Sequence, residues 1–412
     1  MELMKGYKQT EVGLIPDDWK IMSIDQIFDF YSTSNYSKAQ MLTDGEVGCF
    51  HYGLIHSLVD NNYDISKGVK YFVTKKQSKY EYIKDGDVVM VDASEDLSGI
   101  NKSIEISGVQ DKLYIAGLHT FLLRDKGFYQ KNFRGPILNS YFTKAQFYRL
   151  AVGMKVYGVS KQQLKTVVLP IPSISEQTSI AQALSDTDAY ITSIEKFIEK
   201  KRHIKQGSIQ ELLKPKDGWE TKTIKEVATY RRGSFPQPYG LDKWYDDISG
   251  FPFVQVFDVD DNNRLKDETK RYISKAAQQM SVFVKKGSII LTIQGSIGRI
   301  ALTQYDAYVD RTLLIFESFK IPFNSFFFMI SIWRIFEIEK ELAPGGIIKT
   351  ITKEALSSFK ISYPKIIEQE RIAQILSDID IEIQALEEKL KKAKSIKDGM
   401  MQNLLTGKIR LK

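Results

Sequence analysis

Polar and basic side chains on glycine-containing loops are the residues of this sequence best suited to contact a ligand. In the second half of the chain they are Arg231, Arg232, Ser234, Gln294, Ser296, Arg299, Lys349 and Thr350. In the first half they are Ser94, on the loop 92–95, and Lys155, Tyr157, Ser160 and Lys161, on the loop 153–161. Arginine and lysine pair with guanine or neutralise phosphate, while glutamine and asparagine pair with adenine. These residue types predict contacts with nucleic acid, although they also suit ordinary solvated turns.

Motifs for catalysis are missing from the sequence. It has no G-x-x-x-x-G-K-[ST] phosphate loop and no Asn-Pro-Pro-aromatic tetrapeptide of the amino-methyltransferases. Four histidines leave a serine–histidine–aspartate site open, but no G-x-S-x-G turn supports one. Cys49, His51 and His56 resemble part of a zinc site, yet three irregularly spaced ligands fall short of the four that structural zinc prefers. We expect packing roles for these three residues, no metal or cofactor bound by this chain, and no catalytic residue.

The composition permits an anionic partner. The 412 residues carry a formal net charge of +7, with 43% hydrophobic and 26% charged residues, as in ordinary globular proteins. The single cysteine, Cys49, cannot form an internal disulfide, which fits a reducing cytosol. The polar N-terminus predicts no signal peptide, and the most apolar stretch, 323–336, is too short to cross a bilayer. We therefore expect a cytoplasmic protein with no membrane partner.

An internal repeat reveals the elements that must position these loops. At a constant offset of 192 positions, residues 176–213 and 368–405 share 18 identities in 38 positions without a gap. Both copies begin with Glu-Gln, continue with Ile-Ala-Gln and Leu-Ser-Asp-x-Asp, and end with Gly-x-x-Gln-x-Leu-Leu. The regions between the copies share only a loose pattern. The chain therefore alternates two unlike domains with two copies of one segment.

The repeated segments predict two long helices, because their apolar residues recur with the 3.5-residue period of a coiled-coil seam. The seam residues are Ile180, Leu184, Ile191, Ile194, Ile198 and Leu212 in the first copy, and Ile372, Leu376, Ile379, Ile383, Leu386, Leu390 and Leu404 in the second. Lys397 interrupts the second seam, and Lys201 and Lys205 weaken the first. We expect the helices to pair antiparallel around a pseudo-twofold axis. The alternative is that each helix packs on its own domain.

The predicted fold class is mixed α/β, with two variable domains separated by the antiparallel pair of coiled-coil helices. The predicted boundaries are 1–172 for the first domain, 173–214 for the first helix, 215–365 for the second domain, and 366–412 for the second helix and the tail. Strands are predicted at 84–91, 113–124, 251–256, 288–293 and 308–316, and further helices at 144–151 and 326–342.

Several short segments of the chain are similar to motifs of the specificity subunits of Type I restriction-modification systems. They are Thr10–Trp19 (TEVGLIPDDW), Leu169–Pro172 before Glu176-Gln177, Pro364 before Glu368-Gln369, and Leu404–Arg410 (LLTGKIR). The resemblance covers essentially the whole chain. Two repeated helical segments at this spacing make it far more specific than any single short motif.

The resemblance implies a non-catalytic subunit whose variable domains are target-recognition domains, each binding one half of a bipartite asymmetric site in double-stranded DNA. It implies that the helices set the spacing and dock two methyltransferase subunits, which carry S-adenosylmethionine. Restriction subunits would supply translocation and cleavage with ATP and Mg. Lys201 and Lys205 would then loosen that end of the helix pair or serve subunit docking. The competing interpretation is an assembly scaffold whose variable domains bind proteins without direct base readout.

Overall fold

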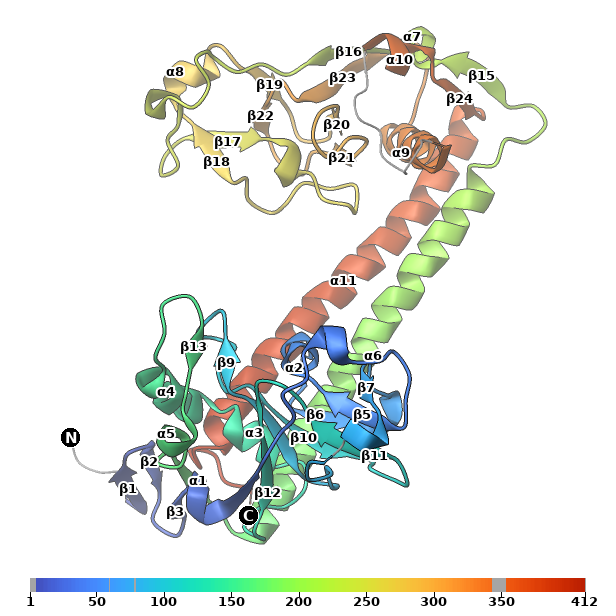
Figure 1. The fold of residues 1–412 in the computed structure, drawn as a ribbon. Coiled ribbons are helices and arrows are strands. Elements are labelled where there is room, and N and C mark those ends of the chain that lie inside the picture. Colours follow the sequence, from blue (N-terminus) through green and yellow to red (C-terminus); the bar gives the residue numbers. More distant parts are fainter. Residues whose placement is uncertain (1–4, 59, 78, 343–352, 412) are drawn as a thin grey trace. The chain divides into compact units, whose positions relative to one another are not determined.

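The computed structural model describes residues 5–58, 60–77, 79–342 and 353–411. The chain forms two compact units. The first unit comprises Met1–Lys196 and Glu387–Lys412, and the second comprises Phe197–Leu386. Each unit therefore holds one mixed α/β domain and one half of each long helix (Figure 1).

Two sheets form the framework of the first unit. The larger has the strand order β4 (Phe28–Tyr31), β12 (Thr120–Asp125), β8 (Val88–Val91), β10 (Ser103–Ser107) and β6 (Asn62–Asp64). The smaller has the order β11 (Leu113–Ala116), β5 (Val47–Phe50) and β7 (Phe72–Val73). Every residue of β8 is buried, because this strand lies in the middle of its sheet and carries only valine and methionine.

Short helices and paired strands complete the first unit. The helices are α1 (Ile24–Ile27), α2 (Tyr52–Ser57), α3 (Arg134–Leu138), α4 (Tyr141–Leu150) and α5 (Lys161–Leu164), with 3-10 turns at Lys38–Gln40, Ile65–Lys67 and Lys75–Gln77. The paired strands are β1 (Tyr7–Thr10) with β2 (Gly13–Pro16), β3 (Lys20–Ser23) with β14 (Val168–Ile171), and β9 (Ala93–Ser94) with β13 (Tyr157–Gly158).

The second unit repeats this framework with different residues. Its larger sheet has the order β16 (Ala228–Arg232), β23 (Leu313–Phe319), β20 (Ile289–Thr292) and β21 (Ile300–Leu302). Its smaller sheet has the order β18 (Arg271–Ile273), β17 (Phe251–Val254), β22 (Ala307–Val309) and β19 (Val282–Val284). The other elements are β15 (Glu220–Thr223) paired with β24 (Lys360–Tyr363), helices α7 (Ile224–Val227), α8 (Lys275–Gln278), α9 (Ser325–Leu342) and α10 (Lys353–Ser358), and 3-10 turns at Asp242–Trp244 and Val256–Asp258.

The strand pairing shows that the two domains share one topology. The order β4-β12-β8-β10 matches β16-β23-β20-β21, and all of these neighbours are antiparallel. In each smaller sheet one pair is parallel, β5 with β11 and β17 with β22. The internal repeat therefore extends from the helices to the domains, and the mixed α/β fold class is confirmed.

Some predicted strands are wrong in extent. The strand predicted at 113–124 is two strands, β11 and β12, because the chain turns at His119, whose φ is 56°. The strand predicted at 308–316 is likewise divided between β22 and β23. The strand predicted at 84–91 begins only at Val88, after a turn at Gly86 with φ 87°. A hydrophobic run does not reveal such turns when both flanking strands are buried.

The two long helices are α6 (Ile174–Leu212) and α11 (Ile366–Leu404), each of 39 residues. Their contacts within each unit establish antiparallel pairing. In the first unit Asp188 forms an ion pair with Lys397, and Glu195 with Lys394. In the second unit Lys201 pairs with Glu382, and Lys205 with Asp380. Residue numbers thus fall along α11 as they rise along α6, which confirms the predicted antiparallel pair (Figure 1).

The predicted seam residues are buried or half-buried. Buried are Ile180, Leu184, Ile191, Ile194, Ile198, Ile372, Leu376, Ile383 and Leu404; half-buried are Leu212, Ile379, Leu386 and Leu390. Near its end α6 buries Ile209 and Leu213, which the seam pattern did not include. Here the helix packs on the core of the second domain, and a straight helix follows a 3.6-residue period.

The start of each long helix also packs on its own domain. Ile180 and Leu184 share a hydrophobic cluster with the strands of the first unit and with Leu404 of α11. Ile372 and Leu376 do the same in the second unit, together with Ile209 of α6. Both arrangements considered from the sequence therefore occur: domain packing at the helix starts and helix pairing beyond them.

Candidate nucleic-acid interface

The structure brings two predicted loops of the first unit together. Strand β9, on the loop 92–95, pairs antiparallel with β13, on the loop 153–161, so that Tyr157 lies opposite Ser94. Met154, Lys155 and Val156 are exposed at the tip of the second loop. Two segments about sixty residues apart in sequence therefore form one surface feature, as a composite binding surface requires.

Beside these loops lies a pocket of about 710 Å³. Its lining residues are Tyr52, Gly53 and His56 of α2, Ala93, Ser94, Glu95, Asp96, Ser98 and Gly99 of the following loop, and Lys102, His119, Asn139, Lys144 and Val156. A Cβ at position 99 would lie 2.5 Å from the Ser94 hydroxyl and 3.0 Å from the His56 ring, so any larger residue would force these side chains to shift. A volume of this size is typical of ligand-binding pockets.

Two lysines tie the walls of this pocket together. Lys102 Nζ donates to the carbonyls of His56 and Leu58 at the end of α2, and Lys144 Nζ donates to the carbonyl of Ile100 at 2.8 Å. Burial, and secondarily the charge of Lys102, lowers the pKa of Lys144 to about 8. These ammonium groups hold main-chain carbonyls at the pocket, whose lining also includes the acidic residues Glu95 and Asp96.

The remaining predicted residues of the first unit have separate surroundings. Ser160 caps the short helix α5, accepting from the Gln163 amide at 3.3 Å, which is a structural role. Lys161 is exposed, with its Nζ 5.3 Å from the centre of the Phe30 ring. Lys155 is fully available to solvent at the loop tip.

In the second unit the described members of the predicted set lie at the end of strand β16, directly after it, and on the loop after β20. Arg231 and Arg232 are exposed at the end of β16, and Arg231 lies 4.0 Å from Glu317. The Ser234 hydroxyl donates to the carbonyl of Met280 at 2.9 Å. Gln294 and Ser296 are exposed on the loop after β20. Lys349 and Thr350 lie outside the described residues.

Arg299 differs from the exposed arginines, because its guanidinium is already engaged. Its Nε lies 2.8 Å from an oxygen of Asp261, and a second nitrogen donates to the carbonyl of Val259 at 3.2 Å. The Thr292 hydroxyl accepts from the Arg299 amide at 3.0 Å and donates to the Ser296 carbonyl. Arg299 therefore shapes the loop that presents Gln294 and Ser296, which is a positioning role that its residue type alone did not predict.

The Glu-Gln pair of the repeat anchors each long helix to its domain. Gln177, at the start of α6, accepts from the Gln130 amide at 2.8 Å and donates to the carbonyls of Phe128 and Pro172 at 3.0 Å each. Gln369 makes the equivalent bonds in the second unit, to the Asn324 amide and the Pro364 carbonyl. The repeat marked these residues, but their function became evident only from the contacts.

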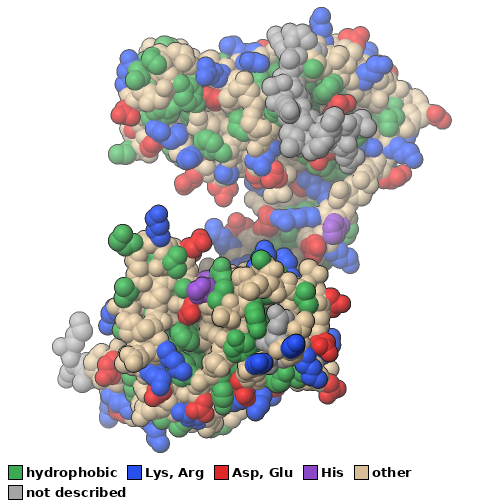
Figure 2. Space-filling model, in the orientation of Figure 1, with side chains coloured by type: hydrophobic (Ala, Val, Ile, Leu, Met, Phe, Trp, Pro, Cys, Tyr) green, Lys and Arg blue, Asp and Glu red, His purple; other side chains and the backbone are tan. Residues whose placement is uncertain are grey.

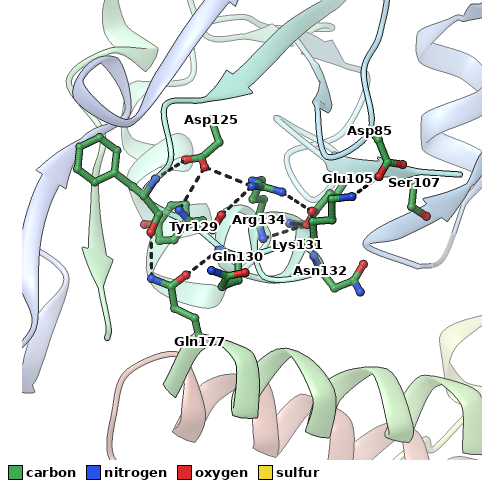
Figure 3. A network of polar contacts seen from close by, with 12 residues as sticks. Asp85, Glu105, Ser107, Asp125, Tyr129, Gln130, Lys131, Asn132, Arg134 and Gln177 are labelled. Atoms are coloured by element: carbon green, nitrogen blue, oxygen red, sulfur yellow. Dashed lines mark hydrogen bonds and ion pairs between the residues drawn. The ribbon is translucent and has the colours of Figure 1, made fainter. Parts of the chain in front are cut away.

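The loop that Gln177 contacts belongs to a larger polar network. Figure 3 shows Arg134 between Asp125 and Glu105, while Gln177 approaches the neighbouring Gln130 from the start of α6. Arg134 lies 2.9 Å from Glu105 and 3.3 Å from Asp125. Burial raises the pKa of Glu105, and the charge of Arg134 opposes that rise. The network is structural, because it links the start of α6 to the loop between β12 and α3.

The tail after α11 is bonded to the first domain. Arg410 forms ion pairs with Glu176, at 2.5 Å, and with Asp18, at 2.8 Å. Glu176 also accepts from the Trp19 indole at 3.0 Å. The motifs that carried the family resemblance, at 16–19, 176–177 and 404–410, thus meet at one place in the first unit.

The surroundings of Cys49 favour packing over metal binding. Cys49 is buried, and burial raises the pKa of its thiol to about 11. His51 caps α2, its Nδ1 accepting from the Gly53 amide at 3.2 Å. Within the described ranges, no group of three histidine, cysteine, aspartate or glutamate residues could hold a metal ion.

Charge is mixed over the visible surface. Figure 2 shows lysine and arginine side chains interspersed with aspartate and glutamate on both units. On the face seen in this view, lysines and arginines therefore do not form one continuous basic patch. None of the helices in the part of the chain that the structure describes has the length and apolarity needed to cross a membrane.

Two domains of one topology, each followed by a copy of one helix, define an internally duplicated α/β protein. The family model "Type I restriction modification DNA specificity domain" matches residues 16–206 and again 216–395. Because the two matches cover most of the chain, this chain belongs to the family of Type I restriction-modification specificity subunits.

Curated relatives match along nearly the whole chain. The putative type I restriction enzyme MjaX specificity subunit of Methanocaldococcus jannaschii is 26% identical, over 99% of this chain and 97% of that protein. The MjaVIII specificity subunit of the same organism is 24% identical, with the same coverage. The crystal structure of the S subunit from M. genitalium matches with a TM-score of 0.57 and 14% identity, over 98% of both chains, which supports the fold.

Proposed function

We propose that this specificity subunit binds a bipartite asymmetric site in double-stranded DNA, each target-recognition domain contacting one half. The proposal rests on one observation: the two domains share one topology but carry different surface residues. The first unit has a histidine- and lysine-lined pocket, and the second presents Arg231, Arg232 and Gln294 on the corresponding framework. Domains of equal shape and unequal side chains suit two different half-sites.

Partner subunits supply the chemistry in this proposal. Two methyltransferase subunits dock on the long helices and bring S-adenosylmethionine, and the helix pair sets the spacing between half-sites. Restriction subunits bring ATP and Mg for translocation and cleavage. A solved structure of similar fold, with a TM-score of 0.57, concerns complex assembly of the type I restriction-modification system. The present chain is the non-catalytic, cytoplasmic subunit of such a complex.

A domain exchange tests the independence of the two halves. Residues 1–172 are replaced by the corresponding domain of another family member, and methylated sites are mapped by methylation-aware sequencing. We expect one half of the recognised sequence to change and the other to remain. Changes in both halves would refute two independent recognition domains.

The competing scaffold function predicts a different dependence on salt. Direct phosphate contacts reduce affinity by about 0.9 log unit per log unit of salt for each phosphate neutralised. A scaffold whose domains bind only proteins adds no such dependence to that of its partners. Titration of duplex DNA with the assembled complex, at several salt concentrations and with variants of the exposed loops, separates the two functions.

A further inference from the structure

His119 has an unusual backbone conformation at the edge of the first unit's pocket. Its φ of 56° lies in the left-handed region, which costs energy for a residue with a side chain. Within the described residues, the other non-glycine residues with positive φ are all asparagines, which tolerate this region: Asn101, Asn132 and Asn263. Left-handed backbone at residues other than glycine recurs at functional sites, although histidine, like asparagine, adopts it more often than most residue types.

Asp92 fixes the imidazole of His119. The Nδ1 atom lies 3.2 Å from a carboxylate oxygen of Asp92, and the Asp92 amide donates to the His119 carbonyl at 3.2 Å. An ionised carboxylate only accepts, so pairing with ionised Asp92 assigns the proton to Nδ1. In the neutral imidazole Nε2 is then left as a hydrogen-bond acceptor. Burial raises the pKa of Asp92, while the neighbouring His119 opposes that rise.

The surroundings of His119 are built to hold it while leaving it accessible. The Tyr52 ring lies edge-on to the imidazole, with 5.5 Å between ring centres, and also contacts His56. The His119 side chain nevertheless remains 51% exposed. A rigid polar group that is held on one side and open on the other is suited to contact a partner.

At the two positions that correspond to this pair, the second unit carries other residues. The Asp92 amide donates to the His119 carbonyl in the first unit, and the equivalent hydrogen bond of the second unit runs from the Ile293 amide to the Thr312 carbonyl at 3.0 Å. Ile293 and Thr312 therefore occupy the positions of Asp92 and His119. Isoleucine and threonine cannot reproduce a carboxylate-fixed imidazole. The Asp92–His119 pair is therefore a chemical difference between two domains that share a framework. Residues that determine sequence preference must differ between the domains in this way.

We propose that His119, held by Asp92, determines base preference in the half-site of the first unit, and that its Nε2 accepts a hydrogen bond from an exocyclic amino group in the major groove. Adenine N6 and cytosine N4 are the bases' amino donors there. This inference rests on the proposed function, because it presumes that the first domain contacts DNA. It adds the residue, the atom and the chemical group that is recognised.

The test uses the full chain expressed with its partner methyltransferase, and maps modified sites by methylation-aware sequencing. The variants are His119→Gly, which suits the left-handed backbone and removes the imidazole, and Asp92→Ala, which removes the carboxylate that holds it. The control is Glu46→Gln, at an exposed position of the first unit that does not line the pocket.

We expect both variants to lose preference at one adenine or cytosine position of one half-site, by about 10- to 100-fold, with the other half unchanged. The control keeps the original preference. An unchanged preference in both variants overturns the proposal, and so does a loss confined to guanine or thymine positions. The exchange of residues 1–172 is run in parallel: if it changes one half-site while His119→Gly changes nothing, only the present inference fails.

Discussion

Lys144 shows how a single buried charge shapes the pocket of the first unit. Its ammonium group donates to loop carbonyls of Ser98 and Ile100, at 3.5 and 2.8 Å, while burial lowers its pKa to about 8. The folded-state pKa is thus below the value of 10.5 assigned to an unperturbed lysine. Between these values the unfolded chain binds more protons than the folded chain, so this group makes folding more favourable as pH rises.

We therefore predict that the stability difference between the native chain and Lys144→Met changes with pH. From pH 7.5 to 10 the native chain should gain in unfolding temperature relative to the variant, because Lys144 loses its costly buried charge. Thermal unfolding of both proteins across this range is the measurement. Lys155→Met, at an exposed loop position, provides the control and should show a constant difference. A constant difference for Lys144→Met as well would contradict the burial argument.

At the residue scale the sequence predicted part of the candidate site. The residue types on the loops 92–95 and 153–161 marked them as possible contacts, and the structure places these loops side by side. His119 was missed because the hydrophobic run around it predicted one uninterrupted strand. Arg299 was assigned by type alone, whereas its ion pair with Asp261 depends on a fold that brings distant residues together.

At the element scale, the lysines that interrupt the helix seam have carboxylate partners. Lys397 pairs with Asp188 in the first unit, and Lys205 pairs with Asp380 at 2.6 Å in the second. The offset of 192 relates Lys205 to Lys397 and Asp188 to Asp380, so the repeat encodes one interhelical ion pair twice. Burial raises the pKa of both aspartates, and the lysines oppose it. The seam thus tolerates a lysine because the facing helix supplies its counter-charge.

We predict similar coupling energies for these two equivalent pairs in double-mutant cycles. Asp188→Asn and Lys397→Met, singly and together, form one cycle, and Asp380→Asn and Lys205→Met the other. Each should give about 1 kcal/mol of coupling in urea unfolding, because both pairs are shielded from water on the helix interface. The exposed pair Glu195–Lys394 is the matched control and should give less than about 0.5 kcal/mol. Unequal coupling energies in the two cycles would show that the repeated ion pair does not contribute equally to stability in the two units.

The long helices were predictable because their apolar period extends over many turns and occurs twice. Their ends were less so, since packing on a domain replaces the seam there. Ile209 and Leu213 are buried in the core of the second unit, although the 3.5-residue pattern assigned Leu212 to the interface. A period derived from the middle of a coiled coil cannot anticipate where the helix meets a globular core.

At the scale of the whole molecule, a repeated framework carries two unlike sets of surface residues. The framework residues recur because they anchor helices, as Gln177 and Gln369 do in their respective units. The loops between them are under no such constraint, so Asp92 and His119 in one unit correspond to Ile293 and Thr312 in the other. Duplication with divergence at the loops therefore yields two recognition domains that differ in chemistry while sharing one fold.

The last prediction concerns Arg231 and Arg232, which are exposed at the end of β16 in the second unit. If both neutralise DNA phosphates, Arg231→Ala with Arg232→Ala should reduce the slope of log affinity against log salt by about 1.8, or about 0.9 for each phosphate. Lys225→Ala, at an exposed position on the short helix α7 of the same unit, should leave the slope unchanged. Affinity of the assembled complex for duplex DNA is measured between 50 and 200 mM salt, roughly the range in which such contacts show their effect.

An unchanged slope in the double variant would place the phosphate contacts of this domain elsewhere. A changed slope together with altered base preference would mean that one arginine pairs with guanine, since phosphate contacts alone weaken all sequences equally.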